Sequence, residues 1–131
     1  IILDFGTATT FDVLIKNTYH GGVIAPGVNL SLEALHRAAA ALPNVEISKP
    51  QDVVGTNTVA CMQSGVFWGY VGLVREICAR IKAERDRDMR VISTGGLAPL
   101  FQQTEKLFDD FQDDLTMHGL TVIHRYNKEN N

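Results

Sequence analysis

The sequence has few cysteines, no excess of basic residues and no long apolar run. Its 12 Lys and Arg residues against 15 Asp and Glu give a formal net charge of −3, which argues against nucleic acid or an anionic membrane as a partner. No apolar run approaches the roughly 20 residues of a membrane-spanning helix. Two cysteines, Cys61 and Cys78, are too few for a disulfide framework. We expect buried free thiols in a reducing, cytoplasmic setting.

The sequence also lacks an initiator Met and opens inside the apolar stretch Ile1-Ile2-Leu3. Natural N-termini are usually frayed and polar. We therefore expect the chain to be the C-terminal part of a longer protein, with an N-terminal half absent. With 131 residues, residues 1–131 are predicted to form a single domain.

Apolar periodicity and turn residues predict a mixed α/β arrangement. Residues 1–5, 11–15 and 19–25 are predicted to form an antiparallel meander, with a turn at Asn17-Thr18. A further strand is expected at residues 89–93, and residues 104–113 are expected to be irregular. Helices are predicted at residues 29–42, 57–84, 98–101 and 115–126.

The long predicted helix contains Gly65, Gly69 and Gly72. Each glycine costs on the order of 1 kcal/mol relative to alanine in a helix interior. We therefore expect another element to approach the glycines closely, either within the chain or across a subunit boundary. Phe67, Trp68 and Tyr70 of the same helix are expected to form a core or dimer contact.

The segment from Asp4 to Asp12 places a glycine and three threonines between two strands. Backbone N–H groups in such a loop can bind phosphate, Gly6 permits close approach, and Asp4 would need a cation to tolerate that phosphate. The loop has no lysine and precedes a strand, so it is neither a Walker loop nor a dinucleotide fingerprint. A tight hairpin capped by threonines would give a similar pattern, and the segment alone does not separate the two.

Two further glycine-marked strand ends add to this pattern. Residues 21–27 carry a glycine pair and a Pro-Gly turn, and Ser93-Thr94-Gly95-Gly96 ends a strand and opens a helix. N–H groups at such a helix start can receive a nucleotide.

Together these residues resemble type III pantothenate kinases, members of the acetate and sugar kinase, Hsp70 and actin superfamily. Residues 4–12 resemble the family's second phosphate-binding motif, and the later motifs follow in order along nearly the whole chain. These are residues 21–27, 54–58 with 62–65, 94–96 and 115–120.

The resemblance implies an α/β fold: the ribonuclease-H-like half of an actin-like ATPase, with a three-stranded antiparallel meander extended by a further strand and helices packed on the sheet. It implies an enzyme that phosphorylates pantothenate to 4'-phosphopantothenate with ATP, towards coenzyme A, in the cytoplasm. It also implies a monovalent cation (potassium or ammonium), magnesium and a homodimer.

The resemblance also assigns roles to residues of this chain. Asp4 matches the monovalent-cation ligand and Thr58 a pantothenate-contacting threonine. The residues matched to ATP binding are Gly6, Thr7, Thr9, Gly95 and Gly96. The family's general base, in a Gly-x-Asp-Arg motif, is expected upstream, so no catalytic residue is assigned in this chain.

Two other functions remain open. One is a non-catalytic accessory or regulatory protein related to the kinases, which would lack the upstream Gly-x-Asp-Arg motif. The other is a different sugar-type kinase of the superfamily, against which the stretch Gly55-Thr56-Asn57-Thr58 argues.

Overall fold

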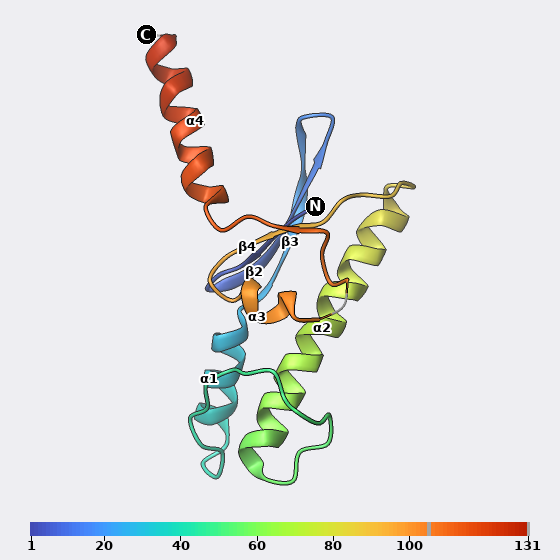
Figure 1. Ribbon diagram of the computed structural model, residues 1–131, viewed down its shortest axis with the longest axis vertical. Coiled ribbons are helices and arrows are strands. Elements are labelled where there is room, and N and C mark those ends of the chain that lie inside the picture. The colour runs from blue at the N-terminus through green and yellow to red at the C-terminus, as the bar shows by residue number, and fades with distance from the viewer. Residues whose placement is uncertain (105, 131) are drawn as a thin grey trace.

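The structure, a computed structural model, describes residues 1–104 and 106–130 and contains one sheet with helices at its face and ends (Figure 1). In chain order the elements are β1 (Ile2–Phe5), β2 (Ala8–Ile15), β3 (Thr18–Pro26), α1 (Val28–Ala38), α2 (Thr58–Glu84), β4 (Ile92–Thr94), α3 (Ala98–Gln102), β5 (Asp110–Phe111) and α4 (Leu115–Glu129).

The sheet has five strands in the order β3-β2-β1-β4-β5. β1, β2 and β3 form the predicted antiparallel meander, and β4 pairs in parallel with β1. The turn between β2 and β3 is one residue earlier than predicted, because Lys16 and Asn17 both have positive φ, 48° and 63°. Two such residues suit the tight turn of a two-residue hairpin. The α/β class and the extended meander are thus confirmed.

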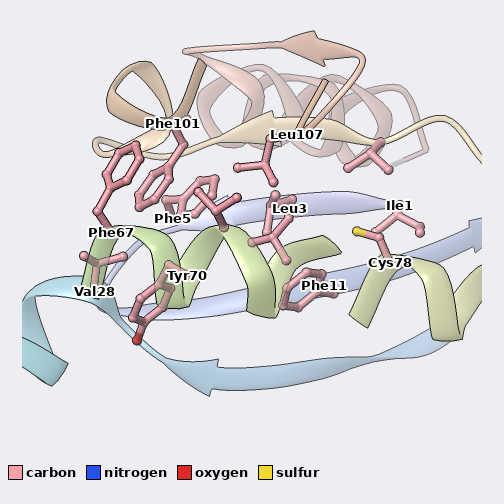
Figure 2. Packing of buried hydrophobic residues seen from close by; sticks show 14 of the residues in the cluster. Ile1, Leu3, Phe5, Phe11, Val28, Phe67, Tyr70, Cys78, Phe101 and Leu107 are labelled. Carbon is pink, nitrogen blue, oxygen red and sulfur yellow. The ribbon is translucent and has the colours of Figure 1, made fainter. Parts of the chain in front are cut away.

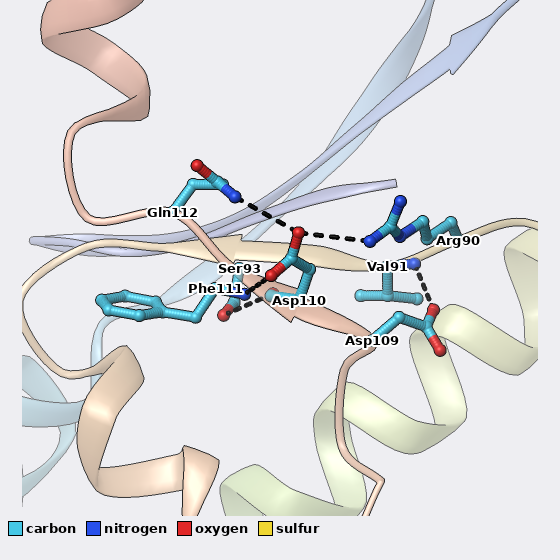
Figure 3. A network of polar contacts seen from close by, with 7 residues as sticks. All are labelled: Arg90, Val91, Ser93, Asp109, Asp110, Phe111 and Gln112. Atoms are coloured by element: carbon cyan, nitrogen blue, oxygen red, sulfur yellow. Dashed lines mark hydrogen bonds and ion pairs between the residues drawn. The ribbon is translucent and has the colours of Figure 1, made fainter.

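β5 lies in the segment 104–113, which the sequence predicts to be irregular, and that prediction is wrong for Asp110 and Phe111. The strand pairs in parallel with β4, and polar side chains hold it there (Figure 3). Asp109 accepts a hydrogen bond from the Val91 N–H at 2.7 Å, and Asp110 pairs with Arg90 at 3.2 Å. These acidic side chains carry no apolar alternation, which is why the pattern did not indicate a strand.

The core lies between one face of the sheet and α2, with α3 closing one end (Figure 2). Phe101 of α3 stacks between Phe5, at 4.7 Å between ring centroids, and Phe67, at 5.1 Å. Phe67 and Tyr70 of α2 are buried, as expected, and Trp68 is half-buried. α2 begins where predicted, because Asn57 caps it by accepting the Ala60 N–H at 2.9 Å.

α1 differs from the prediction in where it ends, and α4 differs in its packing. α1 ends at Ala38 rather than Leu42, and a turn follows in which the Leu42 N–H donates to Ala39. α4 contributes no buried residue and extends away from the sheet (Figure 1). The expectation of sheet packing is therefore wrong for α4, whose apolar spacing indicated a helix but not its partner.

The small residues of α2 also differ from expectation. In the described part of the chain, a Cβ placed on Gly65, Gly69 or Gly72 would have no atom within 4 Å apart from its chain neighbours and the adjacent backbone of α2 itself. Close packing within the chain therefore does not explain these glycines.

Both cysteines are free, as expected, but Cys61 is exposed whereas Cys78 is buried. None of the helices in residues 1–104 and 106–130 has the length and apolar content to cross a bilayer.

Candidate functional site

The tight connection between β1 and β2 is formed by Gly6 and Thr7, both exposed. It is a narrow turn because Phe5 is paired with Thr9 across the two strands. The Gly6 N–H donates to the Ala8 carbonyl at 3.1 Å. Within the described residues the Thr7 N–H has no hydrogen-bond partner. The turn therefore presents one free backbone donor together with the hydroxyl of Thr7.

The residue that follows β3 packs directly against this turn. A Cβ on Gly27 would lie 2.0 Å from the Thr7 carbonyl oxygen and 3.0 Å from that of Gly6. Only glycine allows so close a contact. The two glycine-containing segments that the sequence places apart, residues 4–12 and 21–27, thus meet at one corner of the sheet.

The third glycine-marked segment reaches the same corner through β4. Thr94 pairs with Asp4 of β1, and the chain then turns at Gly95 with a φ of 93°. A Cβ on Gly95 would lie 2.4 Å from Asp4 Oδ1, and one on Gly6 would lie 3.6 Å from the same oxygen. The Asp4 carboxylate is therefore held beside both glycines, with the exposed Gly96 next in the chain.

The environment of Asp4 is unfavourable for a lone negative charge. Burial raises the pKa of the Asp4 carboxyl, and the nearby charge of Asp12 raises that pKa further. In residues 1–104 and 106–130, no hydrogen bond or ion pair offsets this charge. A half-buried carboxylate without a partner can serve as an oxygen ligand for a cation. No cluster of three His, Cys, Asp or Glu side chains suited to a metal ion occurs in the described part of the chain.

Thr9 lies on the opposite side of the sheet from Asp4. Its side chain is fully buried, and its hydroxyl has no hydrogen-bond partner within the described residues. Thr9 belongs to the face that carries Phe11 and Val13, since alternate residues of a strand point the same way. The sequence pattern treated Thr7 and Thr9 alike. Alternation with Phe11 and Val13 was the signal that could have separated them.

Thr58 lies apart from the turn. It is exposed at the first position of α2. Tyr70 of the same helix contacts the end of β3, and Thr58 precedes Tyr70 by about 18 Å of helix at 1.5 Å per residue. The structure therefore brings together Asp4, Gly6, Thr7 and Gly95, but not Thr58.

A cavity of about 500 Å³ opens between α1, the loop that follows it, and Leu97. Leu97, which follows Gly96, lines it together with α1 and the loop after α1. Sequence patterns gave no indication of this cavity, because its walls come from a helix and an irregular loop. The other lining residues are Asn29, Leu32, Glu33, His36, Arg37, Asn44, Val45, Glu46 and Ile47.

Comparison with known proteins assigns the family. The model of the type III pantothenate kinase family matches residues 1–80. The chain is 83% identical over 130 residues to the type III pantothenate kinase of Roseobacter denitrificans, which covers 98% of this chain and 51% of that protein. It is 81% identical over 131 residues to the one of Ruegeria pomeroyi, with 99% and 51% covered. The chain therefore belongs to the type III pantothenate kinase family, and it spans about half the length of these curated relatives.

A solved structure shares the fold. A protein described as a Baf family transcriptional activator from Campylobacter jejuni superimposes with a TM-score of 0.68 at 22% identity, over 98% of this chain and 58% of that one. At this identity the likeness concerns the fold alone.

Proposed function

We propose that the complete protein is a kinase that transfers a phosphoryl group from ATP to pantothenate, giving 4'-phosphopantothenate for coenzyme A biosynthesis. One observation carries this proposal: the Gly6-Thr7 turn, the Asp4 carboxylate and Gly95 meet at one corner of the sheet, although they come from distant parts of the sequence. The names of the relatives, all type III pantothenate kinases, support the choice of substrate.

We infer that residues 1–131 form one domain, the ribonuclease-H-like, C-terminal half of an actin-like ATPase fold. The support is the strand order, an antiparallel meander continued by parallel strands. Ligands in open α/β sheets bind at the carboxyl ends of the strands. Asp4 and Gly95 lie at the ends of β1 and β4, where this rule places a ligand.

In this proposal the chain positions ATP and stabilises its charge, which is most of what phosphoryl transfer requires of a protein. The Thr7 N–H and hydroxyl donate to phosphate oxygens, and Gly6 lets those oxygens approach the backbone. Gly95 and Gly96 accommodate the adenosine side, next to the cavity lined by Leu97. Thr9 makes no contact with the nucleotide in this proposal, since its side chain is fully buried on the other face of the sheet.

Asp4 would hold the monovalent cation, potassium or ammonium. A bound cation offsets the negative charge that burial and Asp12 make costly. Magnesium would accompany the phosphates of ATP, as is usual for this ion.

The remaining proposed roles belong to residues away from Asp4 and the Gly6-Thr7 turn. Thr58 would contact pantothenate, and the general base would be the aspartate of a Gly-x-Asp-Arg motif beyond this chain. We also propose a cytoplasmic homodimer. The exposed glycines of α2 and the exposed apolar residues of α4, such as Leu120 and Ile123, support an association surface.

The proposal is tested by measuring ADP release from the complete protein, with and without pantothenate and with and without potassium. We expect release that requires both. Release with another hydroxylated substrate, but not with pantothenate, would indicate a different kinase. No release under any condition would favour an accessory protein.

A further inference from the structure

Tyr70 is the one tyrosine whose ring is part of the buried core of the described residues, and its hydroxyl makes two hydrogen bonds there. The residue is 6% exposed, and Figure 2 shows it beside Val28 with the oxygen directed away from the aromatic stack. The Tyr70 hydroxyl lies 2.6 Å from the Pro26 carbonyl oxygen and 2.7 Å from Ser31 Oγ.

The direction of these bonds follows from the groups involved. A carbonyl oxygen can only accept, so the single proton of the Tyr70 hydroxyl goes to Pro26. Ser31 is then the donor to the Tyr70 oxygen. The result is a chain of two bonds from α1 through α2 to the end of β3.

The end of β3 is the part of the fold that touches the Gly6-Thr7 turn. Gly27, directly after Pro26, packs against the Thr7 carbonyl so closely that a Cβ would lie 2.0 Å away. The Ser31 N–H also donates to the Gly27 carbonyl at 3.0 Å. Tyr70 and Ser31 thus fix both residues that support the turn.

We propose that Tyr70 is a positioning residue for the Gly6-Thr7 turn, acting through Pro26 and Gly27 without touching the nucleotide. A shift of Pro26 moves Gly27. Because Gly27 already lies in close contact with the Thr7 carbonyl, its movement displaces Thr7 as well. This inference rests on the proposed role of the turn in binding ATP.

Tyr70→Phe tests it, because the ring stays in the core while both hydrogen bonds are lost. Since a hydrogen bond of this kind contributes about 0.5–1.5 kcal/mol, we expect the KM for ATP of the complete protein to rise about 2- to 10-fold, with the KM for pantothenate changed less than twofold. Tyr126→Phe, on the exposed face of α4, is the matched control and should change neither. Ser31→Ala removes only the outer bond, so it should give a smaller change in the same direction.

A second measurement separates this inference from the proposed function. The amide resonances of Gly6 and Thr7 are recorded in the nucleotide-free complete protein and in each variant. We expect Tyr70→Phe and, more weakly, Ser31→Ala to shift them, and Tyr126→Phe to leave them in place. Shifted resonances in a protein that never releases ADP would support the positioning role and contradict the kinase. Unshifted resonances, or equal increases in both KM values, would overturn the role of Tyr70, even where the variant unfolds at lower temperature.

Discussion

Asp4 Oδ1 and the backbone of Gly95 lie in direct contact, so close that a Cβ at position 95 would be 2.4 Å from that oxygen. The two residues are far apart in the sequence and meet because β1 and β4 pair in parallel, with Asp4 opposite Thr94. This contact joins the carboxylate proposed to hold a cation to the glycines proposed to receive the nucleotide.

The first prediction concerns this contact. Gly95→Ala would force a side chain into a backbone with φ of 93° and against Asp4. We expect it to lower the free energy of unfolding by about 1–3 kcal/mol and to weaken activation by potassium. Gly21→Ala is the control, because Gly21 has a similar φ of 95° but no neighbouring atom within 4 Å of a Cβ placed there. Urea unfolding and potassium titration of both variants check this, and equal effects of the two would contradict it.

The second prediction concerns the pKa of Asp4. Burial first, and then the charge of Asp12, raises this pKa above 3.8 in the folded chain. The folded state therefore binds a proton at higher pH than the unfolded state, and stability is lost as the pH rises from 3.8 through the raised pKa. Without a cation, Asp4→Asn should consequently be more stable than the unsubstituted chain at neutral pH. Thermal unfolding at pH 3 and pH 7 measures this, and a variant less stable at pH 7 would contradict it.

The coupling between the two carboxylates gives a third prediction. Asp12→Asn removes the second cause of the shift, so it should lower the pKa of Asp4 towards its ordinary value without removing the effect of burial. Carboxyl NMR titration reads this directly. An unchanged Asp4 pKa would show that Asp12 exerts no influence there.

A fourth prediction tests the aromatic core beneath the corner of the sheet where Asp4, Gly6 and Gly95 meet. Phe101 stacks between Phe5 and Phe67 and is fully buried. Phe101→Ala should lower the free energy of unfolding by about 3–5 kcal/mol, because it leaves a cavity among aromatic rings. Urea denaturation is the measurement. A loss below about 1 kcal/mol would mean that α3 does not support β1 in this way.

A fifth prediction addresses the glycines of α2. Since nothing in the described chain contacts a Cβ at Gly69, Gly69→Ala should stabilise the 131-residue chain by about 0.5–1 kcal/mol. Gly69→Leu in the complete protein should weaken the proposed homodimer. Light scattering over a range of concentrations reports the assembly, and an unaltered dimer in the leucine variant would place the interface elsewhere.

Much of the fold follows from local patterns. The meander and the long helix could be predicted because alternation, turn residues and the Asn57 cap all act over a few residues. β5 could not, because Asp109 and Asp110 hold it by hydrogen bonds to residues distant in the sequence. The apolar face of α4 predicted a helix correctly, but periodicity does not say what the face contacts.

The candidate site, like the fold, could be predicted only in part. Glycine-marked strand ends indicated three segments, and the structure adds that these segments meet at one corner of the sheet. The contacts of Gly27 with Thr7 and of Gly95 with Asp4 depend on strand pairing, which no local pattern specifies. The same pairing puts Thr9 on the buried face, a distinction that a list of small polar residues does not contain.

The central claim is that the Gly6-Thr7 turn binds the phosphates of ATP with a cation at Asp4. The most direct test is a titration of the complete protein with a non-hydrolysable ATP analogue, in potassium or in choline chloride, following the amide resonances of Gly6 and Thr7. We expect both amides to shift strongly in potassium and much less in choline or in Asp4→Asn. Binding of the analogue that leaves both amides unmoved in potassium would contradict the account.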